Sequence, residues 1–204
     1  MLVASVALAG GVWTAVRTGR VQPAGPTPGG YQPAVLPAPK PLGPFSLVDQ
    51  DGHPFGRERL QGRWSFLFLG YTHCPDICPM TMATLRQVRE QLAREPRAAD
   101  GVQFVFVSVD PQRDTPEQLR GYVAHYGEGF LGVTGGDDQL QALARQLGAL
   151  YMRAPEAAGG AYAVDHTSTI FLVDPGAGLH ALFSAPHEAG VIARAFLELQ
   201  RKAP

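Results

Sequence analysis

Residues 66–80, FLFLGYTHCPDICPM, contain the only two cysteines of the chain, Cys74 and Cys78. Three residues separate the two cysteines, and a largely apolar run over residues 65–69 comes directly before them. Such a run, rich in aromatic side chains, is typical of a short strand that is covered on both faces of a sheet. The stretch therefore predicts a buried strand that leads into a loop carrying two thiols.

A helix is predicted to follow the cysteine loop and to end near residue 95. Pro79 suits the first helical turn, which places Cys78 at the helix entry. Unpaired backbone N–H groups and the helix dipole at this end favour the thiolate, the form of cysteine that attacks disulfides and binds metal. We therefore expect reactive sulfurs. The alternative is a plain structural disulfide, but a bridge across so short a loop removes little entropy from the unfolded chain.

The composition fits one globular domain with extensions. Of the 204 residues, 45% are hydrophobic and 17% are charged, and the formal net charge is −1. Beyond residue 40 acidic side chains outnumber basic ones. A nucleic-acid partner is therefore not expected.

The N-terminal segment is expected to tether the protein to a membrane. Residues 1–16 form an uncharged apolar run, which spans about 24 Å as a helix, whereas the hydrocarbon core of a bilayer is about 30 Å thick. We interpret residues 1–21 as a membrane anchor or signal-like segment and the proline- and glycine-rich residues 22–41 as a linker. The expected localisation is membrane-anchored, with the domain on the periplasmic or extracytoplasmic side, although Arg17 and Arg20 favour the opposite orientation under the positive-inside rule.

Residues 42–204 are predicted to form one α/β domain. Asp51-Gly52, between two short extended pieces, indicates a hairpin at its start. A buried strand at residues 102–109 follows the helix, and a strand–helix–strand unit of this kind is a right-handed crossover between parallel strands. The remaining predicted elements are helices at residues 115–126, 137–147 and 188–202, extended pieces at residues 131–134, 150–153, 169–173 and 179–184, and a loop at residues 157–161. This order predicts a thioredoxin-like fold, in which helices flank a central mixed sheet and the hairpin is an N-terminal extension.

His166 is the second candidate for chemistry. A lone histidine is more often structural than a ligand. This one, however, leads into the predicted strand at residues 169–173, which lies in the same sheet as the strand before the cysteines. A residue leading into one central strand can come near a loop leaving another, so we expect His166 to approach the cysteine loop. By contrast, Arg113 and Asp114 are expected to be a solvated loop pair beside a helix start at Thr115.

Three motifs resemble the signature of the Sco/SenC family of cytochrome c oxidase assembly proteins. They are YTHCPDICP at residues 71–79, VDPQRDTP at residues 109–116 and VDHT at residues 164–167, and the likeness extends over residues 42–202. The resemblance implies a membrane-tethered copper protein of thioredoxin fold that acts as a metallochaperone or, if it is an enzyme, as a thiol-disulfide oxidoreductase. Such a protein delivers copper to the binuclear copper site of cytochrome c oxidase subunit II, or reduces the cysteines of that site.

The resemblance also implies the metal ligands, which by motif position are Cys74, Cys78 and His166. The metal is Cu(I) or Cu(II), and an upstream copper donor or thiol reductant is a further implied partner. Two soft sulfurs and one imidazole suit copper, but zinc accepts the same donors together with a carboxylate. His73 and Asp165 adjoin these ligands in sequence. Each is either an additional donor or orienting group, or a surface residue.

Two other functions fit the same residues. In a thiol-disulfide oxidoreductase, Cys74 and Cys78 would be catalytic, one attacking a partner disulfide and the other resolving the mixed disulfide. Redox enzymes of this fold, however, resemble each other in a proline before the third central strand and in two residues between the cysteines. Here residues 156–174 contain no proline, and three residues separate the cysteines. The other alternative is a redox or copper sensor.

Overall fold

The computed structural model describes residues 33–95, 99–156 and 162–202. The predicted anchor at residues 1–21, most of the predicted linker and the predicted loop at residues 157–161 lie outside these ranges. Within the described part of the chain, no helix combines the length and the apolar character needed to cross a membrane.

The centre of the fold is an eight-stranded mixed sheet with the strand order β1-β10-β9-β4-β5-β6-β2-β3. Its strands are β1 (Ala34–Pro41), β2 (Ser46–Asp49), β3 (Pro54–Gly56), β4 (Trp64–Gly70), β5 (Val102–Ser108), β6 (Phe130–Thr134), β9 (Ile170–Val173) and β10 (Gly178–Phe183). A separate two-stranded antiparallel ribbon consists of β7 (Tyr151–Arg153) and β8 (Val164–His166).

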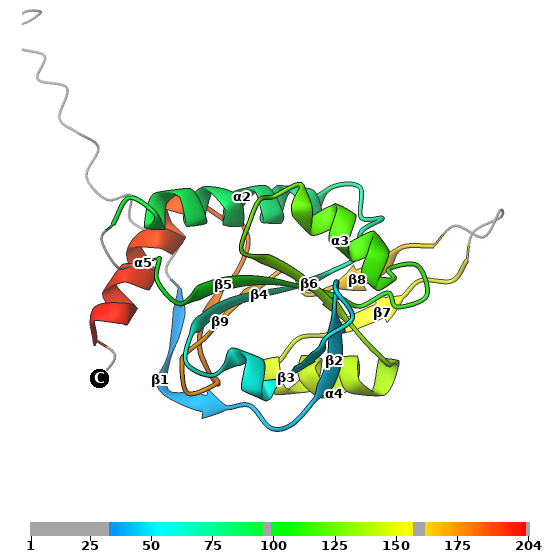
Figure 1. The fold of residues 1–204 in the computed structure, drawn as a ribbon, viewed down its shortest axis with the longest axis horizontal. Coiled ribbons are helices and arrows are strands. Elements are labelled where there is room, and N and C mark those ends of the chain that lie inside the picture. Colours follow the sequence, from blue (N-terminus) through cyan, green and yellow to red (C-terminus); the bar gives the residue numbers. More distant parts are fainter. Residues whose placement is uncertain (1–32, 96–98, 157–161, 203–204) are drawn as a thin grey trace, which may run out of the picture. The chain divides into compact units, whose positions relative to one another are not determined.

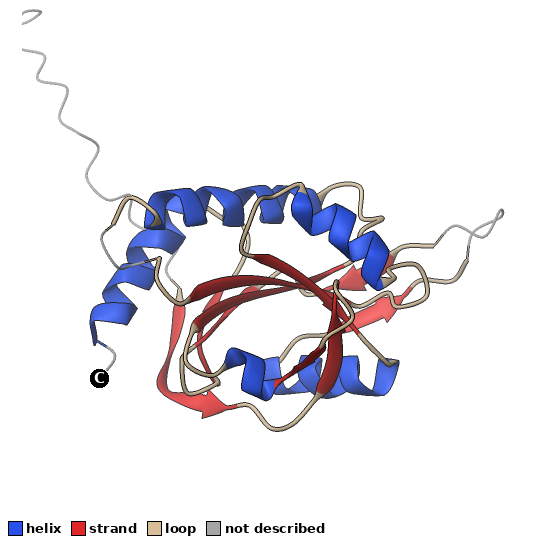
Figure 2. Cartoon of the chain, viewed as in Figure 1, coloured by secondary structure: helices blue, strands red, loops and turns tan. Residues whose placement is uncertain are grey.

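Helices cover both faces of the sheet, as Figures 1 and 2 show. α2 (Ile77–Leu92) and α3 (Pro116–Ala124) lie on one side, and α4 (Asp137–Leu147) lies on the other. α5 (Ala189–Lys202) packs against α2, and a short 3-10 helix, η1 (Arg57–Leu60), follows β3. The arrangement confirms the predicted fold of a mixed sheet between helices.

The core is built on β4 and β5, which pair in parallel as the crossover pattern predicts. Phe66 lies opposite Phe104 and Phe68 opposite Phe106 in this register, and all four side chains are buried. The rings of Phe66 and Phe104 stack with their centroids 5.2 Å apart. Burial of one such side chain stabilises the fold by roughly 1.5–3 kcal/mol, so the strand before the cysteine loop is firmly anchored.

β9 runs antiparallel to β4, with Phe68 opposite Ile170. Because the pair is antiparallel, the start of β9 lies beside the end of β4. The chain leaves β4 into the cysteine loop, and His166 stands four residues before Ile170. The pairing therefore brings the two halves of the predicted site together, beside the end of β4 and the start of β9.

The predicted linker boundary at residue 41 is wrong, because β1 lies within it. β1 pairs antiparallel with β10, with Ala34 opposite Leu182 and Lys40 opposite Leu179. Proline has no N–H to donate, so it is tolerated in an edge strand, where one side of the backbone needs no partner. β1 is such an edge, and this explains how the proline-rich segment joins the sheet.

The predicted N-terminal hairpin is confirmed. β2 and β3 pair antiparallel around a turn in which Gly52 has a φ of 80°, a conformation that glycine adopts without strain. β2 also pairs with β6, so the hairpin extends the sheet at the edge opposite β1.

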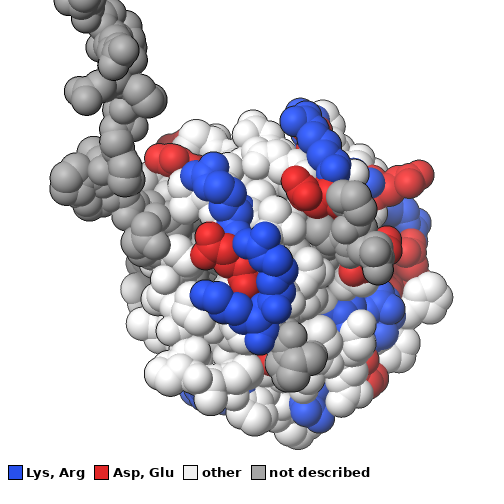
Figure 3. All heavy atoms as spheres, turned by 90° about the vertical axis from the view of Figure 1, so that its left-hand side faces the viewer, with Lys and Arg blue, Asp and Glu red and all other residues white. Residues whose placement is uncertain are grey.

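Charged side chains are mixed on the face drawn in Figure 3, where Lys and Arg lie among Asp and Glu. Opposite charges also pair along α2, where 3.5 Å separates the Arg86 Nε from the Glu90 Oε1. This face therefore has no uniformly basic surface of the kind that binds a polyanion.

Candidate metal centre

The two cysteines lie at the end of β4 and the start of α2. Cys78 is the second residue of α2 and is fully buried, whereas Cys74 lies in the preceding loop and is half-buried. The backbone N–H of Cys78 donates to the Cys74 sulfur at 3.4 Å. An N–H group at the helix start thus holds the more accessible sulfur in place.

The expectation that the helix start makes Cys78 a thiolate is wrong for the metal-free protein. Burial raises the pKa of the Cys78 thiol far above its ordinary value, and the nearby Cys74 raises it further. The backbone hydrogen bond at Tyr71 acts in the opposite direction but is the smaller effect. Desolvation therefore outweighs the favourable groups at the helix start, and Cys78 is a neutral thiol at pH 7.

His166 is the last residue of β8 and lies against Cys78. Its Nε2 is 3.3 Å from the Cys78 sulfur, and its Nδ1 is 3.2 Å from the carbonyl oxygen of Thr167. A carbonyl oxygen only accepts hydrogen bonds, so we assign the ring proton to Nδ1, which leaves Nε2 with its lone pair. The Cys78 thiol then donates to Nε2. A metal ion would replace the proton between this sulfur and this nitrogen.

Aromatic side chains surround the imidazole of His166. The Phe68 and Tyr71 rings stand edge-on to it, with centroids 5.8 and 6.1 Å away. Burial lowers the pKa of His166, so the ring is neutral near pH 7. A neutral imidazole with a free Nε2 is the form that binds metal.

Cys74, Cys78 and His166 together form a compact donor set, as the sequence predicts. Their ligand atoms all lie within 4.8 Å of one another. Two sulfurs and one imidazole nitrogen form a soft donor set, suited to Cu(I) or zinc rather than to magnesium or calcium. These residues fit a copper ion by their chemistry.

A second group of possible donors in the described residues is Asp49, Asp51 and His53. It has a structural explanation. The Asp49 carboxylate accepts the backbone N–H groups of Asp51 and His53 at 3.0 and 2.9 Å, which stabilises the hairpin turn. Two of the three residues are exposed, and none offers sulfur.

His73 and Asp165 lie outside the donor set. His73 is exposed, and its Nδ1 is 3.1 Å from the Thr72 hydroxyl. Asp165 is exposed on β8, and the His166 Nδ1 contacts the Thr167 carbonyl instead. Both residues therefore fit the simpler interpretation as surface residues.

The expectation of a solvated Arg113–Asp114 pair is wrong. Asp114 is fully buried, and so is Asp110 in the same motif. Sequence spacing does not reveal their burial, because decisive partners lie far away in the chain: Thr72 is 42 positions from Asp114, and Tyr162 is 52 positions from Asp110. The one available signal was the density of charged residues directly after the buried strand β5.

Gly70, the last residue of β4, is required by the position of Cys78. A Cβ at residue 70 would lie 2.8 Å from the Cys78 sulfur and 2.8 Å from the Phe106 ring. Gly70→Ala should therefore force buried groups apart and destabilise the fold by roughly 1–3 kcal/mol. Urea denaturation of the metal-free protein measures this change.

Gly121 offers the matched control. It lies within α3, and nothing stands within 4 Å of the place where its Cβ would be. Gly121→Ala should stabilise the protein by roughly 0.5–1 kcal/mol, because alanine favours the helix. If Gly70→Ala were equally stabilising, the inferred contact with Cys78 would be wrong.

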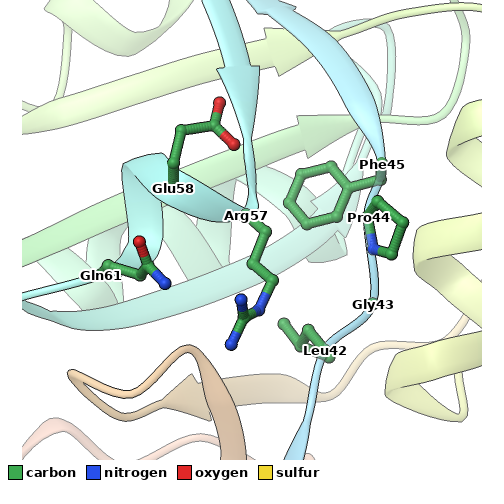
Figure 4. A pocket seen from close by; sticks show the side chains of 7 residues that line it. All are labelled: Leu42, Gly43, Pro44, Phe45, Arg57, Glu58 and Gln61. Atoms are coloured by element: carbon green, nitrogen blue, oxygen red, sulfur yellow. The ribbon is translucent and has the colours of Figure 1, made fainter.

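A pocket also lies near the loop between β1 and β2, and Figure 4 shows its residues. The Arg57 guanidinium points toward Leu42 there, while the Glu58 carboxylate points the other way. The pocket offers no sulfur or imidazole, so it does not extend the donor set. Its lining residues are Leu42, Gly43, Pro44, Phe45, Arg57, Glu58 and Gln61.

Comparisons with known proteins agree with this geometry. The family model described as SCO1/SenC matches residues 35–200. A curated Stutzerimonas stutzeri protein, provisionally named as copper-binding, is 42% identical over 152 residues, which are 74% of this chain and 73% of that protein. The mitochondrial Protein SCO1 homolog 1 of Arabidopsis thaliana is 35% identical over 146 residues, covering 72% of this chain but only 43% of the relative.

A solved structure is also similar. The crystal structure of Arabidopsis thaliana ScoI with copper bound matches with a TM-score of 0.73 and 31% identity. The match covers 79% of this chain and 98% of that chain.

Proposed function

Because the chain belongs to the SCO1/SenC family, we propose that it is a copper-binding metallochaperone. Cys74, Cys78 and His166 hold the ion. The observation that carries the proposal is the convergence of two sulfurs and one imidazole nitrogen within 4.8 Å of one another. Cys74 comes from the loop after β4, Cys78 from α2 and His166 from β8.

Copper is favoured over zinc by three considerations. Two soft sulfurs and one imidazole nitrogen are a complete set for Cu(I), whereas zinc in proteins usually takes four ligands. The described residues place no carboxylate in the group with these three donors. The similar Arabidopsis thaliana structure is one with copper bound.

The unequal burial of the three ligands suggests how the ion is passed on. Cys78 is fully buried, while Cys74 and His166 are half-buried. A partner's ligand can therefore replace Cys74 or His166 first, while Cys78 still holds the ion. Cys78 would be the last sulfur to release copper.

The proposed recipient is the binuclear copper site of cytochrome c oxidase subunit II, as the family resemblance implies. An upstream copper donor or thiol reductant would prepare the protein for loading. We also propose that residues 1–21 anchor the protein in a membrane with the domain on the periplasmic or extracytoplasmic side. Membrane fractionation followed by protease treatment from each side tests this, and recovery in the soluble cytoplasmic fraction would contradict it.

Copper transfer tests the proposed function. Reduced protein loaded with one equivalent of Cu(I) is mixed anaerobically with the metal-free, reduced copper domain of subunit II, and the two are separated. Copper should move to subunit II, and a Cys74→Ser variant that fails to hold copper should deliver none. Copper that stays on the loaded protein at equilibrium would rule out this recipient.

A thiol-disulfide oxidoreductase is the second candidate, favoured by the accessibility of the two sulfurs. Cys74 is half-buried and precedes a fully buried Cys78, the arrangement of an attacking and a resolving thiol. Here the two thiols would become a disulfide as the partner's disulfide becomes two thiols. Metal-free reduced protein mixed with oxidised subunit II distinguishes this role, because thiols appear on subunit II only if electrons are transferred.

A further inference from the structure

The loop between β5 and α3 carries two fully buried carboxylates, Asp110 and Asp114. A buried carboxylate is costly unless hydrogen-bond donors surround it. The partners of these two aspartates include Thr72, which precedes the cysteines, and Tyr162, which precedes the strand ending at His166.

Asp114 holds the cysteine loop. Its Oδ2 accepts the backbone N–H of Thr72 at 2.8 Å, and its Oδ1 accepts the Thr72 hydroxyl at 2.6 Å. The Ser108 hydroxyl donates to the Oδ2 at 2.6 Å. Thr72 stands two residues before Cys74. The carboxylate therefore fixes the backbone from which Cys74 extends.

Asp110 holds the ribbon that ends at His166. Its Oδ1 accepts the Tyr162 hydroxyl at 2.7 Å, and the Arg153 Nη2 lies 3.7 Å from the same oxygen. Its Oδ2 accepts from the Arg113 Nε. Arg153 ends β7, and Tyr162 comes just before β8, so both sides of the ribbon are tied to this carboxylate.

Arg113 strengthens the same connection. Its guanidinium lies over the Tyr162 ring, 3.6 Å from the ring centre, and its Nη1 donates to the Tyr162 carbonyl at 3.0 Å. A stacked guanidinium with two directed hydrogen bonds leaves little rotational freedom. The entry to β8 is therefore fixed relative to the loop that also holds the cysteines.

We propose that Asp110 and Asp114 are positioning residues that set the distance between the two sulfurs and the His166 imidazole. This inference rests on the proposed copper function. Neither carboxylate belongs to the donor group, so both act through hydrogen bonds to the segments that carry the ligands. Loss of such an outer partner typically lowers metal affinity by about 10- to 100-fold.

The test compares Asp114→Ala, Asp114→Asn and the unchanged protein by Cu(I) competition with a chromophoric chelator under reducing conditions. Asp114→Ala should bind about 10- to 100-fold more weakly. Asp114→Asn should recover part of this loss, because its amide oxygen can still accept the Thr72 N–H. The role of Asp110 is tested by Tyr162→Phe, which removes the hydroxyl that donates to the Asp110 carboxylate. This variant should weaken Cu(I) binding less than Asp114→Ala does.

Asp174→Asn is the matched control. The Asp174 carboxylate also accepts backbone N–H groups, from Gly176 at 3.0 Å and Gly178 at 2.8 Å. It lies in the turn after β9, at the opposite end of that strand from His166. Asp174→Asn should leave Cu(I) affinity unchanged, even where urea denaturation shows a loss of stability.

A spectroscopic readout separates positioning from stability. The sulfur-to-copper charge-transfer band of the Cu(II) complex should shift in Asp114→Asn and stay in place in Asp174→Asn. A folded Asp114→Asn variant with unchanged band and unchanged affinity would overturn the proposal. If Asp114→Ala does not fold, the Asp114→Asn and Tyr162→Phe variants still test the proposed positioning role.

A metal-independent measurement distinguishes failure of this inference from failure of the proposed function. The alkylation rate of Cys74 by iodoacetamide in the metal-free protein should change severalfold in Asp114→Asn and not in Asp174→Asn. If the unchanged protein bound no copper, the proposed function would fail while this rate still tested positioning. An equal alkylation rate in both variants would overturn the positioning role.

Discussion

Replacing His166 by alanine should lower the Cu(I) affinity of the reduced protein by more than about 100-fold, because loss of a direct ligand exceeds the effect of losing an outer partner. In the part of the chain that the structure describes, the imidazole belongs to a group of three donors that lie within 4.8 Å of one another. Its Nε2 lies 3.3 Å from the Cys78 sulfur, and burial lowers its pKa so that it is neutral near pH 7. Without it, two sulfurs remain, and the ion loses its only nitrogen donor in this group.

The measurement is a Cu(I) competition titration of the protein purified under reducing conditions. The unchanged protein should bind one copper per chain, and Cys74→Ser and Cys78→Ser should each weaken binding strongly. His125→Ala is the control, because His125 is an exposed histidine at the end of α3. Equal affinity of His166→Ala and the unchanged protein would show that the assigned site is wrong.

The core of the fold was predictable because its signals are local. The strands β4 and β5 are largely apolar runs, and Pro79 and Thr115 mark helix starts within a few residues of their true positions. Thr115 caps α3 as predicted, with its hydroxyl accepting the Gln118 N–H at 3.3 Å. Such patterns depend on neighbours in the sequence, which are visible without coordinates.

The convergence of the site was predictable only in outline. His166 approaches Cys78 because β9 pairs antiparallel with β4, and this pairing is a property of the whole sheet. The supporting carboxylates were missed because Asp114 and Thr72 are 42 positions apart. A single sequence contains no signal for a hydrogen bond over such a separation.

Two other errors have energetic causes. β1 was interpreted as linker because its prolines disfavour sheets, but an edge strand tolerates them. Cys78 was expected to be a thiolate because helix starts favour anions. Burial, which sequence position does not reveal, outweighs that effect and raises its pKa. Copper loading at neutral pH therefore has to displace the Cys78 proton.

Oxidation of the Cys74–Cys78 pair should abolish copper binding at low free copper. Copper needs both sulfurs as thiolates, and a disulfide removes both, leaving the His166 imidazole as the only donor of the group. With oxidised glutathione as oxidant, the two thiols become one disulfide and two molecules of reduced glutathione are released. Half-buried Cys74 would react first, and buried Cys78 would then displace the glutathione.

The test is to oxidise the pair, confirm the bridge by mass and titrate Cu(I) anaerobically, with re-reduced protein as the control. In the reverse direction, bound Cu(I) should protect Cys74 from alkylation in the unchanged protein but not in His166→Ala, which no longer retains the ion. In an oxidising compartment the metal-free protein would drift to the disulfide, so each loading cycle would require a thiol reductant. Undiminished copper affinity of the oxidised form would exclude the cysteines as ligands and would favour the oxidoreductase role.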